Sequence, residues 1–162
     1  MIIGVVSDTH ISNKNEEIPQ AIARALKNVD LVIHAGDFTD LSVLDKLNEV
    51  CKEVVAVCGN MDNISAKARL PQKKIIQAGS YRIGVMHGFG HPGGLIDLLA
   101  KEFKDDKVDI IIFGHSHCAY NKRHKGILFF NPGSPTDKLF ATSNSYGIIE
   151  IKDKIEARIV KI

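Results

Sequence analysis

The sequence predicts an α/β fold in which two sheets of mixed parallel and antiparallel strands pack as a sandwich, with helices outside them in a four-layer arrangement. Short apolar runs rich in Val and Ile recur along the chain and are followed by Gly, Asp, Asn or His, a pattern typical of strands buried on both faces. Helical patterns separate the first three of these runs, whereas the C-terminal part has only strand and turn patterns. A single domain over residues 1–162 is expected, because a chain of this length can bury a core of its own.

The N-terminal part alternates between the two kinds of pattern. Strands are expected over Ile2–Ser7, Asp30–Ala35 and Glu53–Cys58, and helices over Glu16–Lys27 and Leu41–Val50. Each expected helix carries its apolar residues on one stripe, which gives it a face to bury against a sheet. The strand–helix–strand order predicts parallel strands joined by right-handed crossovers.

The middle and the end of the chain follow a different pattern. The middle predicts a weak helix or loop over 64–70, strands over Lys73–Ala78 and Tyr81–His87, a helix over Gly93–Phe103 and a strand over Val108–Phe113. The two strands flank a Gly-Ser pair and are expected to form an antiparallel hairpin. The end predicts strands over Ile127–Asn131, Tyr146–Ile151 and Lys154–Ile162.

Composition and charge narrow the class of protein. No apolar run approaches the roughly 20 residues that a membrane span needs, and the N-terminus lacks a basic leader and a small-residue cleavage pattern, so a cytoplasmic protein without a membrane partner is expected. The formal net charge of +2 offers little long-range attraction for polyanions, which argues against specific nucleic-acid binding. The three cysteines form no C-x-x-C motif and are expected to be reduced, with Cys118 packed in the interior.

Side chains that bind divalent metals follow five of the apolar runs. They are Asp8 and His10 after the first run, Asp37 after the second, Asn60 after the third, His87 at the end of the hairpin, and His115 and His117 after the run that ends at Phe113. Each short motif is common in turns when it stands alone. Because the carboxyl ends of parallel strands share one edge of a sheet, the set as a whole is expected to converge there.

The chemistry of this set indicates the kind of ion. A mixture of carboxylate, amide and imidazole ligands suits manganese, iron, zinc or nickel better than calcium or magnesium. Seven ligands are too many for one tetrahedral ion, whereas two ions about 3.5–4 Å apart with a bridging carboxylate would use all of them and clamp a phosphoryl group. Two divalent metal ions are therefore expected, with manganese first and nickel, iron or zinc as alternatives.

The ordered motifs resemble those of the calcineurin-like metallophosphoesterases, which carry D-x-H, G-D, G-N, H-G and G-H-x-H blocks. In this chain the blocks read Asp8-Thr9-His10, Gly36-Asp37, Gly59-Asn60, His87-Gly88 and Gly114-His115-Ser116-His117. The resemblance covers nearly the whole chain, and the later Asn131-Pro132-Gly133-Ser134 is similar to a turn in the small stand-alone prokaryotic phosphodiesterases of that superfamily. Five blocks in the family's order are a specific signal.

The resemblance implies a metal-dependent phosphodiesterase that acts on small phosphodiesters with a hydroxide shared between two ions. It assigns Asp8, His10, Asp37 and His117 to one ion, and Asp37, Asn60, His87 and His115 to the other. Asp37 would then bridge the ions, and Asp37, Asn60, His87 and Asp62 are the expected catalytic residues. Asp62 is expected to orient the ligands through hydrogen bonds and not to bind metal.

One position departs from the family pattern. Many members have His after Gly-Asn as a candidate proton donor to the leaving group, whereas this chain has Met61. A thioether cannot donate a proton. Either another group such as His91 replaces it, or the natural leaving group departs without such help, and aryl diesters are then better substrates than alkyl diesters.

Other functions and other histidines remain as alternatives. A non-catalytic interaction scaffold of the same fold and a phosphomonoesterase are the competing functions, and a homodimer is compatible with the family. His34 is expected to be a hydrogen-bonded core residue, His91 a helix cap or a substrate contact, and His124 part of an exposed hairpin tip. Asn131 and Ser134 are expected to be turn residues near the site, with phosphate contact as the less favoured role.

Overall fold

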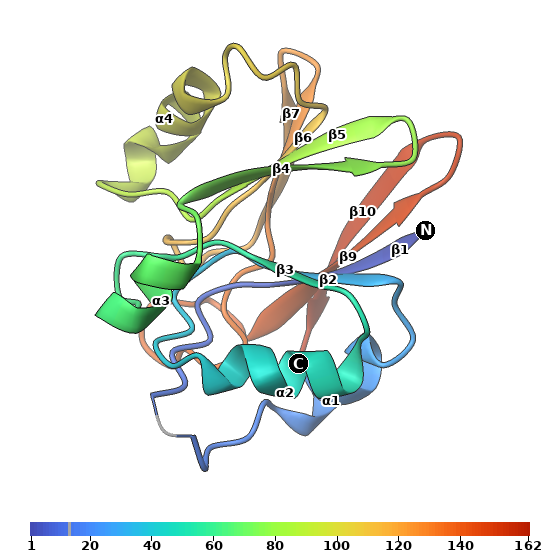
Figure 1. The fold of residues 1–162 in the computed structure, drawn as a ribbon. Coiled ribbons are helices and arrows are strands. Elements are labelled where there is room, and N and C mark those ends of the chain that lie inside the picture. The colour runs from blue at the N-terminus through green and yellow to red at the C-terminus, as the bar shows by residue number, and fades with distance from the viewer. Residues whose placement is uncertain (13) are drawn as a thin grey trace.

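Two five-stranded sheets stand face to face at the centre of the molecule, which a computed structural model describes for residues 1–12 and 14–162 (Figure 1). The first sheet contains, in spatial order, β10 (Ile155–Lys161), β9 (Ser145–Ile151), β1 (Ile2–Val6), β2 (Leu31–His34) and β3 (Val54–Ala56). The second contains β4 (Lys73–Ala78), β5 (Tyr81–Met86), β6 (Ile110–Ile112), β8 (Ile127–Asn131) and β7 (Tyr120–His124). The α-helices are α1 (Gln20–Leu26), α2 (Ser42–Val50), α3 (Ile64–Arg69) and α4 (Leu95–Glu102), the last preceded by the 3-10 turn η1 (Pro92–Gly94).

Each sheet mixes parallel and antiparallel pairs, as the sequence predicts. The strands β1, β2 and β3 pair in parallel, and so do β5, β6 and β8. Antiparallel partners complete the sheets: β9 and β10 beside β1, β4 beside β5, and β7 beside β8. The parallel strands that precede the predicted ligands therefore end on one side of the molecule.

The core has three parts that account for the four layers. Val5, Ile33, Val85 and Ile112 belong to the apolar cluster between the two sheets. A second cluster packs α1 and α2 on the outer face of the first sheet, and a third packs α4 on the outer face of the second. Among the described residues, no helix is both long and apolar enough to cross a membrane.

The N-terminal helix is shorter than predicted. The sequence pattern places its start at Glu16, but α1 begins at Gln20. Pro19 has φ −48° and ψ 129°, which is outside the helical region, and the chain enters the helix only after it. The apolar stripe that predicted the helix is still buried, because Ile18, Ile22 and Leu26 all lie in the core.

One strand was not predicted. Residues 120–124 form β7, which pairs antiparallel with β8 at the edge of the second sheet. Its sequence Tyr-Asn-Lys-Arg-His has no apolar alternation, because four of its five residues face solvent. His124, expected at a hairpin tip, is the last residue of this edge strand and forms a hydrogen bond with Tyr120.

Candidate metal centre

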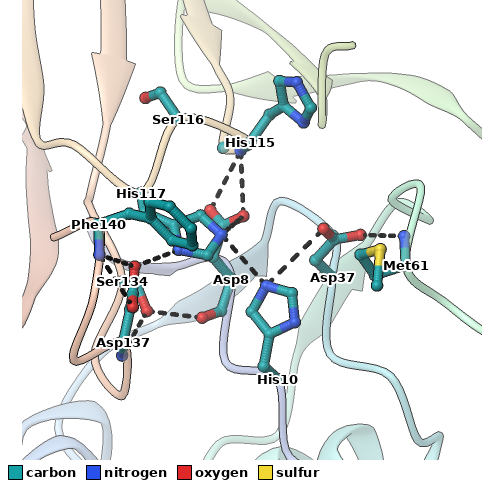
Figure 2. Close-up of polar contacts among 12 residues, drawn as sticks. Asp8, His10, Asp37, Met61, His115, Ser116, His117, Ser134, Asp137 and Phe140 are labelled. Carbon is teal, nitrogen blue, oxygen red and sulfur yellow. Dashed lines mark hydrogen bonds and ion pairs between the residues drawn. The ribbon is translucent and has the colours of Figure 1, made fainter. Parts of the chain in front are cut away.

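Seven side chains with metal-binding chemistry lie at the edge where the central parallel strands end. Asp8 and His10 follow β1, Asp37 follows β2, Asn60 follows β3, His87 follows β5, and His115 and His117 follow β6. Figure 2 shows Asp8, His10, Asp37 and His117 gathered around one point, with the His115 ring turned away from it. The fold thus brings all predicted ligands to one edge, although no two of the five loops are adjacent in sequence.

The backbone of these loops adopts a conformation that most residues avoid. Five of the predicted ligands have positive φ angles: Asp8 (53°), His10 (46°), Asp37 (56°), His115 (68°) and His117 (55°). Each such residue costs on the order of 1 kcal/mol or more, and this kind of strain persists only where the surrounding structure enforces it. Three further non-glycine residues in the described part of the chain share this conformation, so it is concentrated at the candidate site.

Two glycines allow the loops to approach one another. A Cβ on Gly59 would lie 2.1 Å from Asp37 Oδ1, and one on Gly114 would lie 1.9 Å from Ser7 Oγ and 2.7 Å from Asp8 Oδ2. All three distances are far shorter than van der Waals contact. The glycine before each ligand in the Gly-Asn and Gly-His motifs is therefore required by the close packing of a neighbouring ligand loop.

The two carboxylates lie at the centre of the cluster and are almost inaccessible to solvent. Asp37 Oδ2 is 3.2 Å from His87 Nε2 and 3.8 Å from His10 Nε2. Asp8 Oδ1 is 3.3 Å from His117 Nε2 and 3.8 Å from His87 Nε2. Each carboxylate thus contacts histidines on both sides of the cluster, and together they form two groups of three candidate ligands: Asp8, His10 and His117, and Asp8, Asp37 and His87.

The pKa values of these groups show that the cluster attracts positive charge. Burial raises the pKa of Asp8 above its ordinary value, against the opposing effect of His87. Burial acts in the same direction on Asp37, but the proximity of His87 outweighs it and lowers the pKa of that carboxyl. Burial opposes protonation of His87, yet Asp37 and Asp8 raise its pKa overall. The negative charge of the two carboxylates would be offset by a proton on His87 or by a bound cation.

His87 carries the most direct sign of a missing partner. Its Nδ1 lies 2.8 Å from the carbonyl oxygen of Ala35, which can only accept, so Nδ1 carries hydrogen and donates. Its Nε2 is buried, and its 3.2 Å contact with Asp37 Oδ2 is not a well-formed hydrogen bond. A buried polar atom without a partner costs about 1–3 kcal/mol, and a metal ion at this nitrogen would remove that cost.

Asn60 and His115 lie beside this cluster but bind each other. Asn60 Oδ1 is 3.0 Å from His115 Nδ1, and His115 Nε2 is 2.8 Å from the carbonyl oxygen of Gly90. The His115 ring lies 5.4 Å from the His87 ring, centroid to centroid. The 3.0 Å separation of Asn60 Oδ1 and His115 Nδ1 would allow both atoms to bind one ion at ordinary zinc–ligand distances of about 2.1 Å.

Asp62 holds two of the ligand loops together, as expected from its position. Its Oδ2 accepts hydrogen bonds from the backbone N–H groups of Gly59 (2.7 Å) and Asp37 (3.1 Å), and its Oδ1 accepts one from Thr39 (2.7 Å). The side chain is buried, with 3% of its surface exposed. It positions Asp37 and the Gly-Asn loop, and its oxygens are already occupied by backbone donors.

Residues of the Asn-Pro-Gly-Ser segment bind the backbone of two ligand loops. Ser134 Oγ donates to the carbonyl oxygen of Asp8 at 2.7 Å, and Asn131 Nδ2 donates to the carbonyl oxygen of Gly114 at 2.8 Å. Both side chains are fully buried. Both lie near the site as expected, but Asn131 is the last residue of β8 and only Ser134 lies in the turn after it. Both side chains are occupied by contacts to the backbone of the ligand loops.

The remaining two histidines have structural roles. His34 is fully buried, accepts a hydrogen bond from the Gly36 N–H at Nδ1 and faces Thr9 Oγ1 with Nε2, and burial lowers its pKa to about 3. It is the neutral core histidine that the sequence predicts. His91 accepts a hydrogen bond from the Gly93 N–H and so caps η1.

Sequence reasoning missed Asp137. Its Oδ2 lies 2.5 Å from His117 Nδ1, and the same carboxylate accepts hydrogen bonds from the backbone N–H groups of three residues, Leu139, Phe140 and Ala141. These contacts lower its pKa to about 2 despite burial, and the carboxylate fixes the His117 ring with Nε2 directed at Asp8. Its one sequence signal is an acid three residues after the Asn-Pro-Gly-Ser turn, which says nothing about a histidine 20 residues earlier.

The expectation that Cys118 packs in the interior is wrong. Cys118 is exposed, whereas Cys51 and Cys58 are buried, and all three are free thiols. The loop after His117 runs along the surface, where the Cys118 thiol lies 3.8 Å from the Phe140 carbonyl oxygen. A short apolar side chain next to a ligand loop is a poor predictor of burial, because such loops lie at the surface.

Comparisons with known proteins agree with the fold. Residues 1–154 match the calcineurin-like phosphoesterase superfamily domain. A probable metallophosphoesterase of Methanocaldococcus jannaschii is 41% identical over 166 aligned positions, which cover 100% of this chain and 82% of the relative. The structure of Vps29 from Entamoeba histolytica complexed with zinc superposes with a TM-score of 0.79 at 27% identity and covers 99% of both chains. A structure described as that of a novel archaeal phosphodiesterase has the same fold, with a TM-score of 0.79 at 24% identity over the whole of both chains.

Proposed function

The chain belongs to the calcineurin-like phosphoesterase superfamily, and from this premise we propose that it is a phosphodiesterase that works with two divalent metal ions. The family supports a metal-dependent hydrolase of phosphate esters.

The buried and unpartnered Nε2 of His87 is the observation that carries the proposal. It lies among Asp8 and Asp37, two carboxylates that burial makes costly to ionise without a cation. Zinc bound to a solved relative, Vps29 of Entamoeba histolytica, supports the same chemistry at 27% identity.

Two ions account for the ligand set better than one. His10 and His117, whose Nε2 atoms are 3.2 Å apart, would hold one ion with Asp8, while His87, Asn60 and His115 would hold the other. Asp37 lies between His10 and His87 and is the proposed bridge. Asp8 also reaches both histidine groups, so the two carboxylates together would offset much of the charge of two divalent ions. Manganese, nickel, iron and zinc all fit this mixture of oxygen and nitrogen donors.

The chain's own residues prepare the site for hydrolysis. When bound, the ions would polarise a phosphoryl group and supply hydroxide near neutral pH. Asp62 binds the backbone of both the Asp37 loop and the Gly-Asn loop and so fixes their relative position, and Asp137 orients His117. Met61, where many relatives have a proton donor, cannot protonate the departing oxygen. The chemistry available is therefore hydrolysis of esters whose leaving group departs as a stable anion.

The surroundings of the cluster favour diesters over monoesters. The hollow above the cluster is lined by His10, Asp37, Asn60, Met61, Pro92, His115, Ser116, His117 and Phe140. None of these described residues is lysine or arginine. A monoester dianion carries one more negative charge than a diester and usually requires such side chains in addition to the metals.

Hydrolysis of bis-p-nitrophenyl phosphate tests the proposal. The protein is stripped with chelator and assayed with and without Mn²⁺ or Ni²⁺. Metal-dependent turnover is expected for the wild type and at least a 100-fold loss for Asp37→Asn, which keeps the shape of the side chain and removes its charge. Asp105→Asn, at an exposed acid that is not among the predicted ligands, is the matched control and should retain wild-type turnover.

An interaction scaffold of the same fold is the second candidate. Vps29, a protein named for vacuolar protein sorting, shares the fold over the whole chain, and this chain exposes large apolar side chains such as Ile64, Leu139 and Phe140. Absence of turnover with every metal, in protein that binds two ions, would favour the scaffold over the phosphodiesterase.

A further inference from the structure

A hollow of about 410 Å³ lies next to the candidate metal centre and has apolar side chains in its wall. Its floor is formed by predicted ligands, while Met61, Pro92 and Phe140 contribute apolar surface to its sides. Its size is within the range of about 300–1,000 Å³ that is typical of small-molecule sites. Figure 2 shows Met61 beside Asp37 and Phe140 beside His117, so the two apolar side chains flank the cluster.

The two flanking side chains are exposed, and the backbone of each is anchored by a carboxylate of the site. Met61 is 60% exposed, and its backbone N–H donates to Asp37 Oδ1 at 2.8 Å. Phe140 is 70% exposed, and its backbone N–H donates to the Asp137 carboxylate at 3.2 Å. The Phe140 ring stands edge-on to the His117 ring, with the centroids 5.9 Å apart and the planes at 85°. Each apolar side chain is thus placed at the rim by the same carboxylates that shape the candidate metal centre.

A second hollow next to the first has different chemistry. It has a volume of about 380 Å³, shares Asn60 with the first and is lined in part by Lys67 and Gln72. Lys67 Nζ donates to the Asn60 carbonyl oxygen at 2.7 Å. The second hollow also contains Met86 and Phe89, so the two ester arms of a phosphodiester centred on the cluster would meet surroundings that differ in charge. The first has no lysine or arginine among its described lining residues, whereas the second has Lys67.

Resting on the proposed phosphodiesterase function, we propose that the hollow between Met61 and Phe140 binds an aromatic ester arm of the substrate. The substrate class is then a phosphodiester in which one arm carries a planar aromatic group, either a simple aryl group or a nucleobase. Aromatic rings pair favourably with a phenylalanine ring and with a methionine sulfur. A charged arm would lose water there without gaining a lysine or arginine partner from the described lining residues.

Three substrates with the same leaving group test this inference. Ethyl, phenyl and thymidine-5′ esters of p-nitrophenyl phosphate all release p-nitrophenolate and differ only in the retained arm. For each, kcat/KM of the metal-loaded enzyme is divided by the rate of hydrolysis in hydroxide, which removes differences in intrinsic reactivity. The corrected values for the phenyl or the thymidine ester, or both, should exceed that for the ethyl ester by about fivefold or more, the size expected for one or two aromatic contacts.

Variants at the rim identify the contact. Phe140→Ala and Met61→Ala should each reduce the preference for the aromatic arm at least threefold, mainly through KM. Leu139→Ala and Ile64→Ala are the matched controls, since both side chains are more exposed (84% and 88%) and neither lines the hollow. Metal content is measured for every variant, so that a lost ion is not mistaken for a lost contact.

The outcomes separate this inference from the function on which it rests. Equal corrected values with KM unchanged in both rim variants, or a preference that neither rim variant reduces, would overturn the aromatic-arm proposal and leave the phosphodiesterase intact. Equal values with KM raised for all three esters in both variants would show that the p-nitrophenyl arm itself occupies the hollow, which supports the proposal. No hydrolysis of any ester would overturn both. A preference for the thymidine ester alone would indicate a nucleotide source of the aromatic group, and a preference for the phenyl ester alone a simple aryl source.

Discussion

At the scale of single residues, several candidate ligands have backbone or side-chain arrangements that are unfavourable in isolation. Asp8, His10 and Asp37 all have positive φ angles, and His87 keeps a buried nitrogen without a partner. Such costs are usual where function requires a geometry that folding alone would not select. The sequence predicts these residues because each follows an apolar strand, and strand ends converge in this class of fold.

Asp137 could not be predicted from the sequence. No spacing rule connects it to His117, because the two residues meet only through the turn that follows β8. Its contacts with three backbone N–H groups mean that it shapes its own loop as well as the histidine. A residue of this kind becomes visible only once the fold places the two loops side by side.

We expect Asp137→Asn to weaken metal binding by about 10–100-fold, the effect usual for the partner of a metal-binding histidine. The amide keeps an acceptor for the loop N–H groups and loses the charge that orients His117. Titration calorimetry with Mn²⁺ measures the change, with Asp105→Asn as control. Unchanged affinity at both ions would show that Asp137 serves its loop alone.

Met61 provides a second prediction at this scale. Met61→His would place an imidazole where relatives carry their candidate proton donor, beside Asp37. We expect turnover of diesters with alkoxide leaving groups to rise about tenfold or more, with a smaller effect on p-nitrophenyl esters, because general acid catalysis helps poor leaving groups most. Steady-state rates with a series of leaving groups measure the slope; a slope identical to that of the wild type would contradict the proposed role of this position.

At the scale of elements, the buried strands and most edge strands were predictable, and the edge strand β7 was not. The apolar runs of β1, β2 and β6 leave little choice of structure, because their residues are buried on both faces. The edge strand β7 has mostly exposed residues and so carries no periodic signal. The start of α1 was misplaced because the apolar stripe continues upstream of Pro19, which cannot be read as a boundary from the stripe alone.

The helices support the site indirectly by completing the layers. Leu47 of α2 is 1% exposed and packs in the cluster between α2 and the first sheet. We expect Leu47→Ala to lower the free energy of unfolding by about 2–4 kcal/mol with little effect on turnover, because Leu47 packs on the outer face of the sheet and contributes no ligand. Urea denaturation and initial rates test this, with the exposed Glu49→Ala of the same helix as control. An equal loss of activity would show that α2 controls the ligand loops.

At the scale of the whole molecule, the sandwich brings two separate sets of strands to a common edge. The first sheet supplies Asp8, His10, Asp37 and Asn60, and the second supplies His87, His115 and His117. Neither sheet holds a complete ligand set, so the site depends on the packing between the sheets. A bound ion would link the two halves, and ligands that bind only the folded state stabilise it.

The central claim is that this edge holds two ions, and counting them tests it most directly. Metal-free protein is titrated with Mn²⁺ by calorimetry while the melting temperature is followed. We predict two ions per chain and a rise in melting temperature for the wild type, and the loss of at least one ion for Asp37→Asn. A single ion per wild-type chain, or two ions that Asp37→Asn still binds with unchanged affinity, would contradict the two-metal centre with Asp37 as its bridge.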